Sequence, residues 1–198
     1  MGLDQETEMK NGTMQIFKDL QKIFKLSSID PTKVYIAGGS LIGSDDPNDI
    51  DLYCEDFGTI EKVEEALSII SYKKSITDLA STFHVMEYKC PVQVIKILQG
   101  KPEDVVKQFD FEQNSSYLKF SDTQPFHTNG SNSLKMCEKT KTPNTMLQRL
   151  IKMLGKGYTI EAGELRGLLK VVDDHFKDTP DFWNLSKKDL GSFYEEKK

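Results

Sequence analysis

An apolar segment that runs directly into a glycine turn constrains the fold of this chain more than any other feature. The segment Val34–Ala37 leads into the Gly-Gly-Ser turn at 38–40, and nine residues after the serine the motif Asp49-Ile50-Asp51 opens a second apolar segment, Ile50–Cys54. Each pattern is common by itself, but the combination indicates two buried strands joined through a turn. We therefore expect the turn and the acid pair to meet at adjacent strand ends.

The two aspartates carry oxygen ligands on one side of the second strand. Residues i and i+2 of a strand point to the same face, about 7 Å apart along the chain, so Asp49 and Asp51 converge. Neighbouring carboxylates repel unless a cation lies between them, and such ligands suit Mg²⁺ or Mn²⁺ with substrate phosphates completing the shell. Two ions about 4 Å apart can hold the attacking and leaving oxygens of a phosphoryl displacement. Tyr53 shares this face, where it either stacks on a base or, as we prefer, packs in the core.

The glycine turn offers a backbone that a ligand can approach closely. Gly38 and Gly39 have no Cβ, so the chain can turn sharply there, and Ser40 can present its hydroxyl and amide to phosphate oxygens. No histidine lies near Ser40 in the sequence, which favours a phosphate ligand over a nucleophile.

Together these residues resemble the nucleotidyltransferase superfamily that includes DNA polymerase β, poly(A) polymerases and CCA-adding enzymes. The resemblance implies that Gly38, Gly39 and Ser40 bind the nucleotide and that Asp49 and Asp51 bind the catalytic metals. It also implies an activity, the metal-dependent transfer of a nucleoside monophosphate from an NTP to a hydroxyl with release of pyrophosphate.

Further segments extend the resemblance to residues 33–160. Lys101–Val106 followed by Phe109–Phe111, and later Thr142-Pro143 through Arg149 to Lys156-Gly157-Tyr158, look like a poorly characterised phage and bacterial nucleotidyltransferase-like group. This similarity strengthens the expected fold more than the expected reaction.

The expected catalytic set departs from the superfamily at one position. Members usually carry a third carboxylate on a neighbouring strand, whereas the strand predicted at 92–97 carries Gln93 there. An amide oxygen can ligate a metal weakly or orient the attacking hydroxyl, but glutamine cannot act as a general base, a role worth typically ~10²–10⁴-fold. Glu87 on the preceding strand, predicted at 82–88, is the nearest substitute, although a solvent-facing role fits it better. The site is therefore either a two-carboxylate enzyme or a weakened one. The competing function is a catalytically weak or inactive nucleotide-binding and interaction module on the same fold, and a third option is a scaffold that binds neither NTP nor metal.

Three cations follow one stripe of a helix predicted at 143–155. Arg149, Lys152 and Lys156 are spaced i, i+3 and i+7. They either face the cleft and neutralise the triphosphate, which makes Arg149 and Lys152 candidate nucleotide ligands, or form a solvated face opposite the leucines. Both interpretations stay open from sequence.

Charge and cysteine content restrict the partners. A formal charge of −5 argues against tight, nonspecific binding of long nucleic acid but is compatible with a local basic groove. The acceptor is tRNA, a protein side chain or a small molecule, and the acidic charge slightly favours the last two.

Three cysteines without C-x-x-C spacing indicate neither zinc nor a disulfide framework. Reduced thiols, the absence of signal-peptide order at the N-terminus and the absence of an 18-residue apolar run predict a cytoplasmic protein without membrane contact. The oligomeric state does not follow from the sequence.

The order of helical and strand patterns predicts an α+β fold, with a small mixed β-sheet nucleotidyltransferase core flanked by helices and a C-terminal helical subdomain. We expect the core with its N-terminal helix at residues 1–140 and the helical subdomain at 141–198. The expected helices lie at 12–26, 59–71 with Thr59 as the N-cap, 102–108, 143–155 and 161–176, with a further element at 180–198. The segment 114–141 is expected to be irregular with two short strands.

Overall fold

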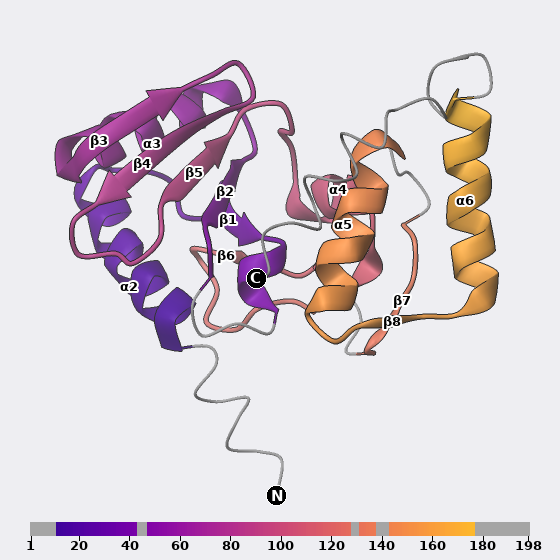
Figure 1. Cartoon of the computed structure of the whole chain (residues 1–198). Helices are drawn as coiled ribbons and strands as arrows, with labels where there is room; N and C mark the ends of the chain where they lie inside the picture. Colours follow the sequence, from indigo (N-terminus) through magenta and orange to yellow (C-terminus); the bar gives the residue numbers. More distant parts are fainter. Residues whose placement is uncertain (1–10, 43–46, 128–130, 138–142, 177–198) are drawn as a thin grey trace, which may run out of the picture. The chain divides into compact units, whose positions relative to one another are not determined.

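The computed structural model describes residues 11–42, 47–127, 131–137 and 143–176 (Figure 1). The chain divides into two compact units, Met1–Lys141 and Thr142–Lys198. The element expected at 180–198 lies outside the described residues. The first unit holds a mixed sheet flanked by helices, which confirms the predicted α+β class.

The sheet has six strands in the order β3-β4-β5-β2-β1-β6. Only β2 and β5 run parallel among the described pairs, and the other neighbours are antiparallel. The strands are β1 (Val34–Ala37), β2 (Ile50–Cys54), β3 (Ser71–Ile76), β4 (Ala80–Val85), β5 (Val92–Ile95) and β6 (Tyr117–Lys119).

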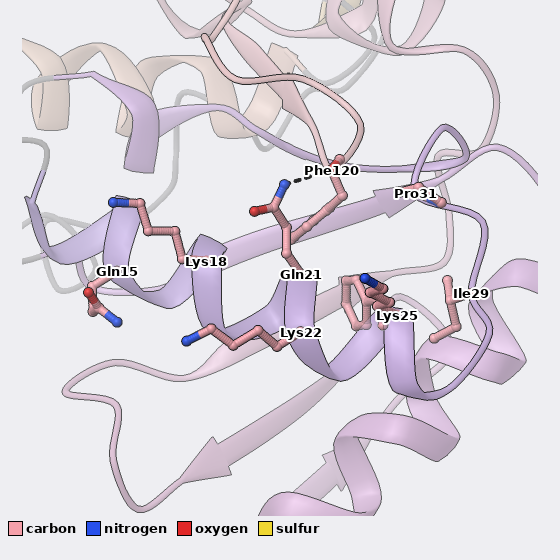
Figure 2. A pocket seen from close by; sticks show the side chains of 9 residues that line it. Gln15, Lys18, Gln21, Lys22, Lys25, Ile29, Pro31 and Phe120 are labelled. Carbon is pink, nitrogen blue, oxygen red and sulfur yellow. Dashed lines mark hydrogen bonds between the residues drawn. The ribbon is translucent and has the colours of Figure 1, made fainter.

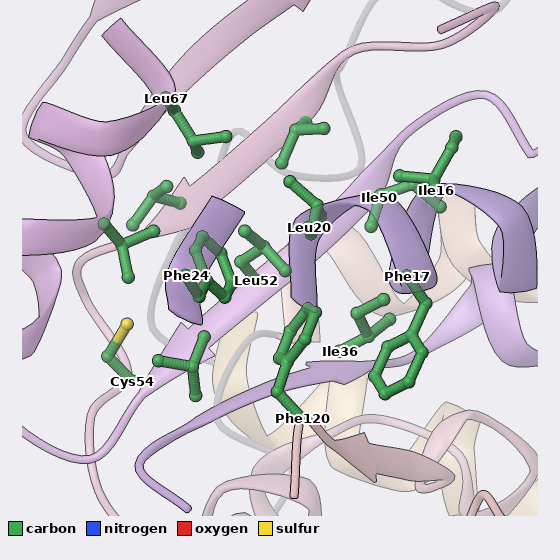
Figure 3. Close-up of a cluster of buried hydrophobic side chains, with 14 of the residues drawn as sticks. Ile16, Phe17, Leu20, Phe24, Ile36, Ile50, Leu52, Cys54, Leu67 and Phe120 are labelled. Atoms are coloured by element: carbon green, nitrogen blue, oxygen red, sulfur yellow. The ribbon is translucent and has the colours of Figure 1, made fainter. Parts of the chain in front are cut away.

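One face of the sheet is covered by two helices, α2 (Asn11–Leu26) and α3 (Phe57–Ile70). Their apolar side chains and those of the strands form one continuous cluster, shown in Figure 3. Leu20 and Leu67 reach it from the helices, and Ile36 and Leu52 reach it from the strands, each 0% exposed. Phe120 closes the cluster, stacked on Phe17 with ring centroids 4.6 Å apart. Burial of this strand face fixes the opposite face as the one that carries Asp51, because successive side chains alternate.

The opposite face is covered at one end by α4 (Pro102–Val105) and the 3₁₀ turn η2 (Val106–Gln108). A second apolar cluster lies there, in which Val105 and Val106 contact the aromatic side chains of the strands. Tyr35 and Tyr53 stack in this cluster with ring centroids 5.7 Å apart, and Phe109 packs 5.8 Å from Tyr53. Tyr53 therefore takes the core role that we preferred from sequence.

The remaining elements are short in the first unit and helical in the second. In the first unit they are the 3₁₀ turns η1 (Gly39–Leu41) and η3 (Glu112–Asn114) and the strand β7 (Ser133–Leu134). The second unit contains α5 (Pro143–Gly155), β8 (Thr159–Ile160) and α6 (Ala162–Phe176). Within the described residues we find no helix with the length and apolar character that a bilayer crossing requires.

Three local predictions were wrong. The edge strand β3 was not predicted, because all six of its side chains are exposed or half-exposed and no apolar alternation marks it. The strand expected at 82–88 ends at Val85, so Glu87 lies in the following turn with its side chain exposed. Helix α3 begins at Phe57 with Asp56 as its N-cap, two residues before the expected start, and Thr59 is instead the residue that the cap holds.

The Asp56 cap gives a first prediction, on stability. Its Oδ1 accepts from the Thr59 backbone N–H at 2.8 Å, and its Oδ2 lies 2.8 Å from the Lys33 ammonium. These hydrogen bonds, that from Lys33 foremost, lower the pKa of Asp56 to about 2. We expect Asp56→Ala to lower the free energy of unfolding by about 1 kcal/mol, measured by urea denaturation. Asp56→Asn should lose less, because asparagine also caps helices.

The same carboxylate predicts a pH dependence. Because its folded pKa lies below the ordinary value of 3.8, the ionised form stabilises the fold above about pH 4 and loses this contribution as the pH falls towards 2. The difference in melting temperature between the native protein and Asp56→Asn should therefore shrink between pH 4 and pH 2. A constant difference across that range would contradict the assignment.

Candidate functional site

The strand directions bring the glycine turn and the acid pair to one edge of the sheet. β1 ends where β2, β5 and β6 begin, because β1 is antiparallel to β2 and β6 while β5 is parallel to β2. The register sets Ile36 opposite Leu52. Because the strands are antiparallel, Gly38, which follows Ile36 by two residues, lies opposite Ile50, which precedes Leu52 by two. The turn after β1 and the residues that open β2 are therefore neighbours in space as well as in sequence.

Gly38 has a backbone conformation that other residues avoid. Its φ of 92° and ψ of −148° lie in a region that is almost restricted to glycine. Its N–H donates to the Ser116 carbonyl at 3.1 Å, and a Cβ at this position would lie 3.8 Å from the Phe109 ring. Gly39 has no positive φ, and a Cβ there would meet nothing within 4 Å. The first glycine is thus required by the fold, and the second leaves open space beside the turn.

Ser40 combines a held backbone with a hydroxyl that has no hydrogen-bond partner among the described residues. Its carbonyl accepts from the Thr13 hydroxyl at 2.9 Å, which ties the turn to the first part of α2. Its own Oγ is buried and makes no hydrogen bond with the described residues. A buried polar atom without a partner is costly, so this hydroxyl is available to a ligand that reaches the turn.

Asp51 lies next to Gln93 on the face of the sheet opposite α2 and α3, which α4 and η2 cover only at one end. The parallel pairing of β2 and β5 sets these two residues opposite each other, and β4 sets Thr82 opposite Gln93 on its other side. Adjacent strands are roughly 4.8 Å apart, so the Asp51 carboxylate and the Gln93 amide belong to one cross-strand row. Asp49 stands one residue before β2, and both aspartates are half-buried. The register thus sets Gln93 beside Asp51, and its place as the counterpart of a third carboxylate stays a prediction.

The donor set fits a hard divalent cation. Asp49 and Asp51 supply carboxylate oxygens and Gln93 an amide oxygen, which are the ligand types that Mg²⁺ and Mn²⁺ accept. Within the described ranges no group of three or more His, Cys, Asp or Glu side chains could hold a metal ion. Two carboxylates without a third acid would leave ligand positions for phosphate oxygens and water.

The predicted nucleotide ligands Arg149 and Lys152 belong to the second unit. Both lie on α5 and both side chains are exposed, as is Lys156 beyond the helix end. The buried side of α5 carries Met146, Leu150 and Met153. Their part in nucleotide binding stays a prediction.

Sequence reasoning missed the residues that hold the turn in place. Ser116, at 1% exposure, bonds Gly38 through its carbonyl, and its hydroxyl lies 3.0 Å from Nδ1 of His127. Next to it, the Tyr117 hydroxyl donates to Glu103 at 2.8 Å, and burial with this bond raises the pKa of Tyr117 to about 12. No local pattern marks Ser116, because its role depends on β6, a strand of three residues, pairing with β1.

The family model that describes Gabija anti-defense 2 family proteins matches residues 8–139, two thirds of the chain. This chain belongs to the Gabija anti-defense 2 family. The matched part of this family member includes the turn, the acid pair and Gln93, and it ends before α5. No curated protein matches the sequence significantly.

Several solved structures of CCA-adding enzymes have a similar fold. The Thermotoga maritima CCA-adding enzyme complexed with tRNA matches with a TM-score of 0.60 at 16% identity, over 83% of this chain and 43% of that one. A CCA-adding enzyme in complex with ATP matches with a TM-score of 0.61 at 16% identity, over 85% and 43%. This member of the Gabija anti-defense 2 family thus spans less than half the length of those enzymes. At such identities the likeness shows the nucleotidyltransferase fold alone.

Proposed function

We propose that this protein is a metal-dependent nucleotidyltransferase that acts against the Gabija defence by moving a nucleoside monophosphate from an NTP to a hydroxyl acceptor. The observation that carries the proposal is the convergence of the Gly38–Ser40 turn with Asp49, Asp51 and Gln93 at one sheet edge. The nucleotidyltransferase fold of the similar structures supports it. The acceptor belongs to a protein, a small molecule or a tRNA.

In the proposed reaction the acceptor oxygen attacks the α-phosphorus, the bond to the β-phosphate oxygen breaks, pyrophosphate leaves and the hydroxyl proton passes to water. Bound Mg²⁺ or Mn²⁺ would neutralise charge on the phosphates. Asp49 and Asp51 would hold the cation, and the amide of Gln93 would orient the acceptor hydroxyl. The turn binds the β- and γ-phosphates through its amides and the Ser40 hydroxyl. That Arg149 and Lys152 of the second unit also bind phosphate stays a prediction. The protein acts mainly through position and charge.

Calorimetric titration with each NTP, with and without Mg²⁺ or Mn²⁺, tests the nucleotide site, and pyrophosphate release with candidate acceptors tests the transfer. We expect binding that requires the metal. If no NTP binds in the presence of either metal, the proposal is wrong.

The second candidate function is a nucleotide-binding module without turnover, and Gln93 in the position of a carboxylate favours it. This alternative predicts metal-dependent NTP binding with no pyrophosphate release under any acceptor condition. It also predicts that Gln93→Asp creates release where the native protein has none. Release by the native protein would exclude it.

Ser40→Ala separates binding from stability. Because its Oγ has no partner among the described residues, we expect the substitution to leave the free energy of unfolding unchanged or slightly raised. Loss of a hydrogen bond to a charged phosphate should weaken NTP binding by about 1.5–3 kcal/mol, roughly 10–100-fold. Urea denaturation and calorimetry measure the two effects. Thr13→Val, which removes the bond to the Ser40 carbonyl, should instead lower stability.

A further inference from the structure

A groove runs along α2 on the surface of this acidic protein. It lies between the helix and the chain near Pro31 and Phe120 (Figure 2), is open to solvent, and has a volume of about 770 Å³. We call it the α2 groove. The Gln21 amide crosses to the Phe120 carbonyl at 2.8 Å and joins the helix to the end of β6, 99 residues later in sequence.

The polar lining of the α2 groove is cationic. Lys18, Lys22 and Lys25 line it and are exposed, at spacings of four and three residues that leave all three on one side of the helix. Lys22 pairs with Asp19 at 3.2 Å, but no described residue that lines the groove is an aspartate or glutamate. In a protein with a formal charge of −5, three lysines in one groove make a local positive site.

The first part of α2 is common to the groove and to the glycine turn. Its first lining residue, Gln15, lies two positions after Thr13, whose hydroxyl holds the Ser40 carbonyl at 2.9 Å. From Gln15 to Lys25 the helix rises roughly 15 Å. A ligand with regularly spaced negative charges that lies along the lysines would therefore run parallel to the axis of α2, whose first part also holds the turn.

We propose that the α2 groove binds the phosphodiester backbone of a single-stranded nucleic acid. Lysine ammonium groups bind phosphates as point charges. The Gln15 Nε2 donates to Asp19 at 3.1 Å, and its amide oxygen can accept a hydrogen bond from a sugar or a base. Screening over about 8–10 Å limits repulsion from the acidic remainder of the surface. That the bound strand supplies the acceptor hydroxyl rests on the proposed nucleotidyl transfer, whereas the binding itself does not.

Fluorescence anisotropy of labelled twelve-nucleotide oligo(U) and oligo(dT), without NTP and with EDTA, tests the proposal. Three phosphate contacts predict that the logarithm of the binding constant falls with the logarithm of salt concentration with a slope of about −2, or about fifteenfold weaker binding from 50 to 200 mM salt. Lys18→Gln/Lys22→Gln/Lys25→Gln should abolish most of this dependence. The matched control Lys62→Gln/Lys73→Gln/Lys74→Gln removes the same charge from exposed positions on α3 and β3 and should leave the slope unchanged.

Three outcomes would overturn the proposal. These are no binding of either oligonucleotide by the native protein, equal losses in the two triple variants, or a glutamate peptide of the same charge that binds as tightly, which would indicate an acidic protein partner. Oligonucleotide binding and NTP binding are measured separately on the native protein. Oligonucleotide binding without NTP binding would therefore contradict the proposed transfer and support nucleic-acid binding by the α2 groove. NTP binding without oligonucleotide binding would contradict only the proposal about the groove.

Discussion

Replacing Asp49 and Asp51 together by asparagine is expected to lower metal-dependent nucleotidyl transfer by about 10²–10³-fold. Removal of both carboxylates removes the charges that hold the cation, whose stabilisation of the reacting phosphates is worth several kcal/mol, and each 1.4 kcal/mol is tenfold in rate. The measurement is pyrophosphate release at saturating NTP. The expectation follows from their positions beside Gln93 and at the level of the glycine turn.

A binding readout separates this effect from misfolding. In the native protein, Mg²⁺ with NTP should raise the melting temperature, because ligands that bind only the folded state stabilise it. The double variant should keep its circular dichroism spectrum and lose the shift. Asp78→Asn, the same substitution at one exposed position between β3 and β4, should behave like the native protein. Unchanged transfer in the double variant would exclude the acid pair from the reaction.

Alanine at Gly38 and alanine at Gly39 are expected to have opposite effects. At Gly38 the φ of 92° strains any L side chain, which should lower the free energy of unfolding by about 1–3 kcal/mol. At Gly39 neither space nor φ opposes a Cβ, so stability should hold or rise by about 0.4–1 kcal/mol, because alanine restricts the unfolded chain. Urea denaturation of both variants measures the difference.

Nucleotide binding completes the comparison of the two glycines. If phosphates approach the turn over Gly39, the added methyl group should weaken NTP binding by about tenfold or more, equal to roughly 1.4 kcal/mol, in a protein that is no less stable. Each glycine then has one measurable role, Gly38 in the fold and Gly39 in the site. Native NTP affinity in Gly39→Ala would show that the ligand does not use this side of the turn.

Periodic apolar patterns in the sequence predicted the helices and strands that have one buried face. Helix α2 and strands β1 and β2 were confirmed nearly to the residue, because buried positions recur at the period of a helix or a strand. Strand β3 has no buried face, so its sequence carries no such signal. The start of α3 was misplaced because Asp56 and Thr59 are both acceptable caps, and the bond from Asp56 to the Thr59 N–H decides between them.

For this protein the sequence alone determined the fold class, the glycine turn and the acid pair, because they consist of residues close together in the chain. Tertiary structure decided that Asp51 stands opposite Gln93, that Ser116 holds Gly38 and that Phe120 closes a lysine-lined groove on α2. The physical reason is that strand register and helix packing are set by burial of the whole sheet face, in which residues up to 99 positions apart become neighbours.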